Sequence, residues 1–198
     1  MTRRTTIATF RRHGGLLHTS AALRLGVHPR DLYGLRDDGT IEAVSRGVYR
    51  LSSGAPLGHP DLVTVAARAP RSIVCLISAL AYHGLTSEVP HAVWIALPRG
   101  TKTPKIDHPP IRVVRVSKEL VSLGVEVKKL GPISVNIYGV ARTIADCFKF
   151  RNKIGVDVAV EGLRLCLEKR TARPVDILHF ARRLRVERVM RPYLEALQ

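Results

Sequence analysis

Apolar residues in the first 26 positions recur at the spacing of short amphipathic helices. Ile7 and Phe10 are three residues apart and predict the inward face of a helix over Thr5–His13, which the following pair of glycines ends. The segment SAALRLG predicts a second short helix that ends at Gly26, with Thr19 as its N-cap residue. The pattern therefore predicts two short helices in succession, and the second supports the next helix in the chain.

A third helix is predicted in the stretch that follows, GVHPRDLYGLRDDGTIEAVSRGVYRL. His28 and Pro29 begin this helix and Gly39 ends it, because proline favours the first helical turn and glycine favours the position after the last turn. The helical period places the nearby apolar residues on the buried side and leaves the polar ones exposed. The apolar residues that we expect in the core are Val27, Leu32 and Leu35.

A two-stranded hairpin is predicted directly after the third helix. Its strands are Ile41–Val44 and Val48–Leu51, and Arg46 lies at its tip beside Gly47. A helix-turn-helix whose second helix runs into a hairpin has the arrangement of a winged helix. We therefore expect an N-terminal winged helix-turn-helix domain.

The segment SSGAPLGHP, residues 52–60, is rich in serine, glycine and proline and predicts a domain boundary. The expected domains are residues 1–55, the winged helix-turn-helix, and residues 61–198, an α+β domain with a small sheet and C-terminal helices. The fold class is thus α+β. In the second domain we expect helices at Asp61–Arg68, Ser72–His83, Val140–Phe150, Val156–Arg170, Val175–Leu184 and Met190–Leu197, and strands at Ala92–Leu97, Ile111–Val116, Val125–Leu130 and Ile133–Tyr138.

Charge is unevenly distributed along the chain. The sequence has 32 Lys and Arg against 16 Asp and Glu, a net charge of +16. Residues 1–55 hold nine basic and four acidic side chains, residues 56–98 two of each, residues 99–141 eight and three, and residues 142–198 thirteen and seven. A positive field attracts polyanions and accelerates their association. A codon bias towards arginine is the alternative source of this composition, but the segmentation favours nucleic-acid binding.

Several other classes of protein are disfavoured. The longest nearly uncharged run, Ile73–Leu85, has 13 residues and is too short to span a membrane, and the N-terminus lacks a hydrophobic signal core, so we expect a cytoplasmic protein. Cys75, Cys147 and Cys166 are far apart among apolar neighbours, which predicts buried reduced thiols and no zinc site. The phosphate-loop, HExxH and GxSxG motifs are absent. We therefore expect neither an enzyme nor a cofactor.

Polar side chains at the positions where a winged helix touches DNA are the candidate contacts. Arg30 and Tyr33 lie early on the exposed side of the third helix and are candidates for base edges or phosphate, and Arg36 lies further along for phosphate. Arg46 at the hairpin tip is a candidate for the minor groove or phosphate, and Ser20 for a phosphate. The expected DNA-binding residues are Ser20, His28, Arg30, Tyr33, Arg36 and Arg46.

Two alternatives to this interpretation stay open. The basic residues could solvate an exposed face of a winged helix that binds only proteins. Glu126 and Lys128 could instead form the ExK pattern of a nuclease, since strand alternation places them on one face. A nuclease needs a second carboxylate, and the upstream candidate is Asp107, which lies in a proline-rich loop.

Two further polar residues are interpreted as structural. Asp146 follows Arg142 by four residues in the segment RTIADCF, which predicts an ion pair within one partly buried helix. His83 beside Gly84 closes a buried helix in this interpretation and binds no metal. The basic segments KFRNK and ARRLRVERVMR could extend the DNA interface, meet an acidic partner surface or be solvated.

Three segments together resemble a known family: GLLHTSAALRLGVHPRDLYGLRDDGTIEAVSRGVYRL, SIVCLISALAYHGLTSEVPHAVWIALPRG and ARTIADCFKFRNKIGVDVAVEGL. They resemble the AbiEi-type antitoxins of abortive-infection, type IV toxin–antitoxin systems. The resemblance implies a winged-helix transcriptional repressor joined to an antitoxin domain, which binds repeats in its own promoter and counteracts a cognate nucleotidyltransferase toxin. It also implies that the candidates at positions 20, 30, 33, 36 and 46 lie in DNA-binding elements.

Overall fold

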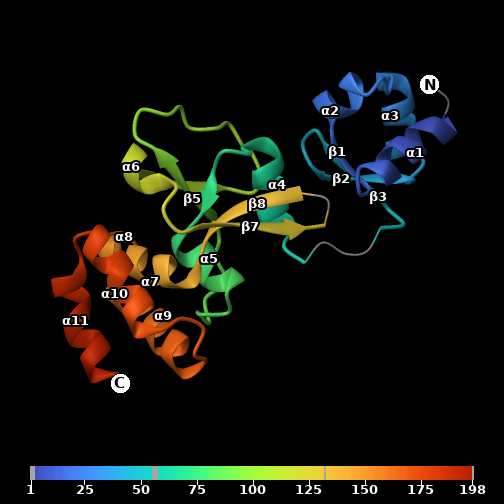
Figure 1. The fold of residues 1–198 in the computed structure, drawn as a ribbon. Coiled ribbons are helices and arrows are strands. Elements are labelled where there is room, and N and C mark those ends of the chain that lie inside the picture. Colours follow the sequence, from blue (N-terminus) through green and yellow to red (C-terminus); the bar gives the residue numbers. More distant parts are fainter. Residues whose placement is uncertain (1–2, 55–57, 132, 198) are drawn as a thin grey trace. The chain divides into compact units, whose positions relative to one another are not determined.

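The computed structural model describes residues 3–54, 58–131 and 133–197, and its helices and strands form a mixed α+β fold (Figure 1). The contacts divide the chain into two compact units. Unit 1 comprises residues 1–70, 104–109 and 128–135, and unit 2 comprises residues 71–103, 110–127 and 136–198. The sequence-based domains, 1–55 and 61–198, divide the chain at an earlier point, because the helix that begins at Pro60 groups with unit 1.

Unit 1 begins with the order of elements that the sequence predicted. The described elements are α1 (Arg3–Arg12), β1 (Leu16–His18), α2 (Thr19–Arg24), α3 (Pro29–Asp37), β2 (Ile41–Ser45) and β3 (Val48–Leu51). The β2–β3 hairpin is joined by β1, which pairs with β3 in antiparallel fashion, so that the strand order is β1-β3-β2. The strand between the first two helices thereby attaches the hairpin to the helices.

The core of unit 1 is formed by the predicted apolar positions. Val27, Leu32 and Leu35 are at most 2% exposed, and Phe10 of α1 is fully buried with them. Burial of apolar surface is the main favourable term in folding, so this cluster fixes which face of α3 stays in solvent. A second small cluster joins residues of β1 and β3 to α4 (Pro60–Arg68) and to the segment at residues 128–135.

The N-terminus of α2 differs from the prediction at one residue. Thr19 is the first residue of the helix and not its N-cap; His18 is the N-cap, and its Nδ1 accepts a hydrogen bond from the backbone N–H of Ser20 at 3.1 Å. The Thr19 hydroxyl instead donates to the carbonyl of Gly47 in the hairpin turn, at 3.1 Å. The threonine therefore ties α2 to the hairpin, and the imidazole takes over the capping role.

A second sheet, of five strands, has the strand order β6-β5-β4-β8-β7. Its strands are β4 (Ile73–Val74), β5 (Val93–Pro98), β6 (Ile111–Val116), β7 (Val125–Leu130) and β8 (Ile133–Tyr138). The last three coincide with the predicted ranges. β5 pairs with β6 in parallel, and β4 pairs antiparallel with β5 and parallel with β8.

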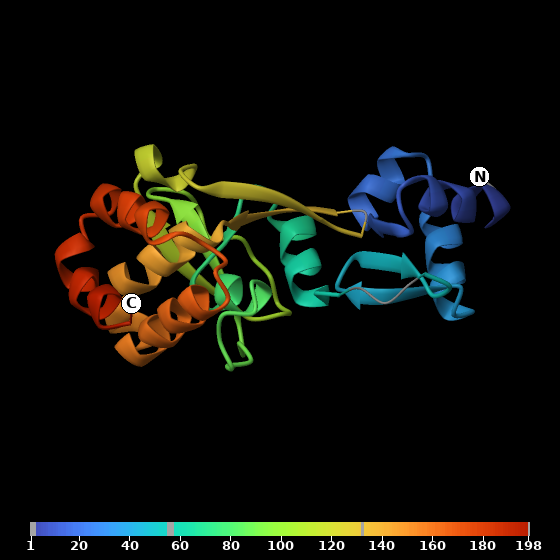
Figure 2. The same cartoon turned by 60° about the horizontal axis from the view of Figure 1, so that its bottom comes forward.

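Helices of unit 2 surround α7 (Val140–Lys149), which is buried along most of its length. They are α5 (Leu76–Tyr82), α6 (Lys118–Val121), α8 (Arg151–Ile154), α9 (Val156–Glu168), α10 (Pro174–Arg183) and α11 (Glu187–Ala196). The orange and red helices lie side by side in both views (Figures 1 and 2), and α7 packs against α5, α9 and α10. None of the helices within residues 3–54, 58–131 and 133–197 has the length and apolar character needed to span a bilayer.

The predicted helix at Ser72–His83 is wrong at its first residues. Ile73 and Val74 form β4, and the helix α5 begins at Leu76. Both β4 residues are β-branched and pair with residues of β5, which favours extended backbone over helix. His83 is the C-cap residue of α5, and its Nε2 lies 2.8 Å from the carbonyl oxygen of Tyr138, in accord with a structural role.

The three cysteines are buried and free, as the sequence predicted. The ion pair between Arg142 and Asp146 is also confirmed, with 2.8 Å between Nε and Oδ2. It is buried more deeply than expected, since the side chains are 0% and 2% exposed.

Candidate nucleic-acid interface

The exposed face of α3 carries the basic and aromatic residues that the sequence singled out. Leu32 and Leu35 are 0% and 1% exposed, whereas Arg30, Tyr33 and Arg36 are exposed, Tyr33 at 42%. The helical period produces this division, since residues three and four apart share a face. Arg30 forms no ion pair with any residue in the described ranges. Its guanidinium is therefore available to a ligand.

His28 is the N-cap residue of α3, the place that His18 occupies at the start of α2, and Ser20 is the second residue of α2. The Nδ1 of His28 accepts a hydrogen bond from the backbone N–H of Arg30 at 3.1 Å, as the Nδ1 of His18 does from that of Ser20. The Ser20 hydroxyl also lies 2.8 Å from the Nδ1 of His18. His28 therefore positions the first turn of α3, and Ser20 stays exposed beside the capping imidazole.

Arg36 is held by two neighbours on the exposed face. Its Nε and Nη2 donate to Oδ1 of Asp37 at 2.8 and 2.6 Å, and its guanidinium carbon lies 5.1 Å from the centre of the Tyr33 ring. The hydrogen bond to Asp37 raises the pKa of Arg36. An exposed ion pair of this kind contributes little to stability, because water screens it. A phosphate can therefore replace the carboxylate at small cost.

Arg46 projects from the hairpin turn, with its side chain 86% exposed. Its Nη1 lies 3.5 Å from Oδ2 of Asp107, a long and exposed contact. Gly47, next in the chain, has a φ of +76°, a conformation that residues with a Cβ rarely adopt. The Arg46 guanidinium is therefore exposed to solvent at the tip of the hairpin.

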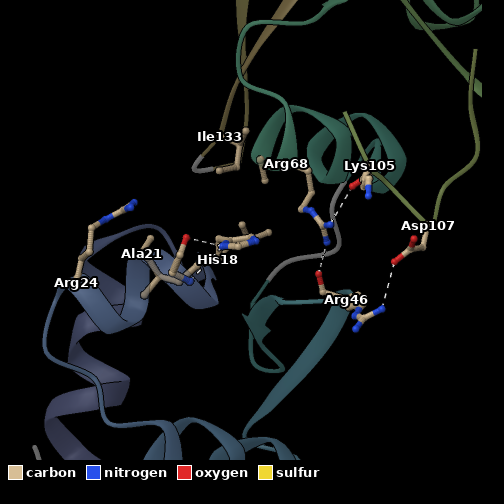
Figure 3. Close-up of a pocket in the computed structure, with 12 residues that line it drawn as sticks. His18, Ala21, Arg24, Arg46, Arg68, Lys105, Asp107 and Ile133 are labelled. Carbon is tan, nitrogen blue, oxygen red and sulfur yellow. Dashed lines mark hydrogen bonds and ion pairs between the residues drawn. The ribbon is translucent and has the colours of Figure 1, made fainter. Parts of the chain in front are cut away.

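A pocket of about 880 Å³ lies between these elements of unit 1 (Figure 3). Arg68 of α4 occupies its centre, where Nη1 donates to the carbonyl of Arg46 at 2.6 Å and Nη2 to that of Lys105 at 3.1 Å. Burial lowers the pKa of His18, and the charges of Arg68 and Arg24 lower it further. The other residues that line the pocket include Leu16, Leu17, Ser20, Ala21, Ala67, Asp107 and Ile133.

The structure therefore brings some of the predicted residues together and separates others. Tyr33 and Arg36 form one cluster on α3, and Ser20 and Arg46 line the pocket. Three basic residues of this pocket were missed by the sequence analysis: Arg24, Arg68 and Lys105. The excess of basic over acidic residues at 99–141 indicated that Lys105 could belong to a basic surface. No pattern in the sequence predicted that Lys105 lies near the β2–β3 hairpin. The missed residues extend the basic surface of unit 1.

The nuclease alternative rests on Asp107 and Glu126. Asp107 faces Arg46, and Glu126 is exposed on β7. Over the part of the chain that the structure describes, no group of three or more His, Cys, Asp or Glu residues is placed to hold a metal ion.

Comparison with known proteins identifies the N-terminal segment. Residues 5–52 match the family described as transcriptional regulator, AbiEi antitoxin, which confirms the resemblance to AbiEi-type antitoxins over that segment. Among solved structures, the crystal structure of the RV2827C protein from Mycobacterium tuberculosis is similar, with a TM-score of 0.56 and 13% identity over 98% of this chain and 80% of that chain. At that identity the similarity concerns the fold alone. No curated protein matches the sequence.

Proposed function

We propose, from the match of residues 5–52 to the AbiEi family of transcriptional regulators, that this chain is a DNA-binding repressor and antitoxin. Its N-terminal elements form a winged helix-turn-helix in which α3 enters the major groove and the β2–β3 hairpin is the wing. The repressor binds double-stranded DNA at repeats in its own promoter and thereby regulates its own operon in the cytoplasm.

The exposed face of α3 is the observation that carries this proposal. Arg30 and Tyr33 lie on the first turns of the helix, opposite the buried Leu32 and Leu35, where a recognition helix meets base edges. A guanidinium can donate two hydrogen bonds to guanine, which contributes about 1–3 kcal/mol of discrimination against other bases.

Phosphate contacts supply the remaining affinity. Arg36 and Arg46 each face a carboxylate in the free protein, and both contacts are exposed. Exposed ion pairs contribute little to stability, so Arg36 and Arg46 lose little when they leave Asp37 and Asp107. Their charge-assisted hydrogen bonds to phosphate oxygens therefore favour the complex with DNA. Arg68 holds the backbone of Arg46 and so fixes the wing for this exchange.

Fluorescence anisotropy with the protein's own upstream DNA tests the proposal. With about four to eight phosphates neutralised, the logarithm of the affinity is expected to fall with the logarithm of salt concentration at a slope of roughly −4 to −7. Arg30→Ala and Arg46→Ala are each expected to weaken binding, and Arg46→Ala to make the slope less steep by about 1.

Arg164→Ala is the matched control, since it removes one exposed arginine from α9 of unit 2. It is expected to leave the affinity for the promoter duplex unchanged. Absence of binding at low salt, or equal effects of all three variants, would contradict the proposed interface. A flat response to salt would favour a winged helix that binds only proteins.

The antitoxin activity is assigned to unit 2, which has its own core and lies entirely outside the matched segment. Its proposed target is a nucleotidyltransferase toxin encoded beside this chain. A growth assay with both proteins expressed tests this, with the Arg30→Ala, Arg46→Ala double variant in the full chain. The variant is expected to lose repression and keep neutralisation; loss of both activities with the fold intact would refute separate roles.

We also propose that the chain acts without catalysis. Incubation of DNA or RNA with the protein and Mg²⁺ or Mn²⁺ is expected to leave the nucleic acid intact. Cleavage that is abolished by Glu126→Ala would instead establish the nuclease alternative.

A further inference from the structure

A second basic pocket lies within unit 2, apart from the elements assigned to DNA. It has a volume of about 510 Å³ and is lined by residues that follow β5 and by parts of β6, α6, α7, α10 and the turn after α10. Small-molecule sites commonly have volumes of roughly 300–1,000 Å³. Its cationic residues are Arg99, Arg115, Lys149, Arg183 and Arg185.

These five cations outnumber the two carboxylates in the lining, Glu119 and Asp146. In the described ranges none of them forms an ion pair, although Arg115 donates to the hydroxyl of Thr103 at 2.7 Å. Glu119, also in the lining, is held by its own backbone and by Ser117, which lower its pKa. Burial lowers the pKa of Lys149; the charge of Asp146 opposes this effect, and nearby arginines add to it. With five cations against the two carboxylates of Glu119 and Asp146, the pocket carries a net positive charge that attracts an anion.

Two of the cations are held on well-fixed backbone. Lys149 is on the last turn of the buried helix α7, and Arg185 lies between Leu184 and Val186, which are 3% and 4% exposed. Arg185 has a φ of +58°. Fixed charges bind a ligand at a smaller entropic cost than charges on mobile loops.

A buried carboxylate supplies an independent indication of a ligand. Asp146 lines the pocket and is 1% exposed, with Oδ2 accepting from Nε of Arg142 at 2.8 Å. Its other oxygen, Oδ1, and Nη2 of Arg142 are both buried without a hydrogen-bond partner among the described residues. Buried polar atoms in folded proteins almost always have a hydrogen-bond partner. The ligand therefore needs a donor as well as an anionic group.

We infer that this pocket binds a small phosphorylated ligand that also carries hydroxyl or amino donors, the chemistry shared by nucleotides and sugar phosphates. The phosphate contacts Lys149, Arg183 and the neighbouring arginines, whereas a hydroxyl or amino group of the ligand donates to Oδ1 of Asp146. Charge-assisted hydrogen bonds of this kind are the strong ones in phosphate recognition.

Isothermal titration calorimetry of the full chain, at about 0.15 M salt, tests the inference with ATP, ribose 5-phosphate and inorganic phosphate. The first two probes distinguish a nucleotide from a sugar phosphate, and saturable binding of either at one site is expected. Inorganic phosphate is expected to bind about tenfold or more weakly than ribose 5-phosphate, because it lacks the sugar hydroxyls that reach Asp146. No binding of either organic probe, or equal affinities for ribose 5-phosphate and inorganic phosphate, would overturn the inference.

Lys149→Gln and Arg183→Gln are each expected to weaken binding about 10- to 100-fold. Both side chains are exposed, so the fold is expected to persist, as circular dichroism would verify. Arg188→Gln is the matched control, because it removes an exposed charge from α11 outside the pocket, and is expected to have no effect. Equal effects of all three variants, or displacement of the bound probe by a short DNA duplex, would show a general polyanion surface and refute a small-molecule site.

Discussion

Replacement of Arg142 by methionine is expected to destabilise unit 2 strongly. The arginine is fully buried, and its Nε donates to Asp146. Its Nη1 donates to the carbonyls of Leu120 and Leu123 at 3.2 and 3.3 Å, and its guanidinium carbon lies 4.5 Å from the centre of the Tyr138 ring. Methionine fills much of the same volume but leaves the carboxylate buried without its cation.

The expected loss in the free energy of unfolding is about 3–5 kcal/mol, the usual effect of removing one partner from a buried ion pair. For a chain of this size that corresponds to a decrease in melting temperature of roughly 6–20 °C. Burial raises the pKa of Asp146, and Arg142 opposes that effect. Without Arg142 the pKa rises further, so the destabilisation is expected to diminish as the pH falls through the new pKa and the carboxyl is protonated.

Urea unfolding followed by the fluorescence of Trp94, the single tryptophan, measures this change, since Trp94 is buried in β5 of unit 2. The matched control is Arg164→Met, which breaks an i,i+4 pair with Glu168 of the same 2.8 Å length but with side chains 50% and 53% exposed. The control is expected to lose less than about 1 kcal/mol. Equal losses in the two variants, or a loss that does not diminish in acid, would refute the role assigned to the buried carboxylate.

Three further predictions concern other parts of the chain. Gly34→Ala is expected to stabilise α3 by about 0.5–1 kcal/mol, since nothing lies within 4 Å of the added Cβ, whereas Gly39→Ala, at a φ of +75°, is expected to destabilise it; hydrogen exchange of the α3 amides would measure both. Because the pKa of His18 is lowered in the folded state, the contribution of its neutral form to stability is fully present above pH 6.5 and is lost as the pH falls through the folded-state pKa. An NMR titration of His18 is expected to give a midpoint below 6.5, and Arg68→Gln is expected to raise that midpoint. Hydrogen bonds from Ser87 and Thr86 lower the pKa of Glu161, so their contribution is lost as the pH falls below the usual range of glutamate, and Glu161→Gln should flatten the pH dependence of unfolding in that range.

Elements with a strong periodic pattern could be predicted from the sequence. The bounds of β6, β7 and β8 agree with the predicted ranges, and the burial of Leu32 and Leu35 follows from the helical period of α3. The short strand β4 could not be predicted, because Ile73 and Val74 adopt extended backbone through pairing with distant strands. The local sequence pattern does not show which distant strands will pair with this segment.

The candidate sites show the same division. The exposure of Arg30 and Arg36 could be predicted from spacing within one helix, and so could the pairing of Arg142 with Asp146. The role of Arg68 in holding the hairpin could not, because it depends on the Arg46 carbonyl 22 positions away. The complete burial of Asp146 likewise depends on packing by helices distant in the sequence.

Discontinuity of unit 1 limits how the gene can be shortened. Leu16 and Val48 pack with Val63 of α4, and with Leu130 and Ile133 from the segment at residues 128–135. During synthesis this hydrophobic cluster cannot form completely until the ribosome has passed residue 135. A fragment cut at the sequence-based boundary, after residue 55, would leave Leu16 and Val48 uncovered and is expected to aggregate, so a soluble fragment of unit 1 requires residues well beyond position 52.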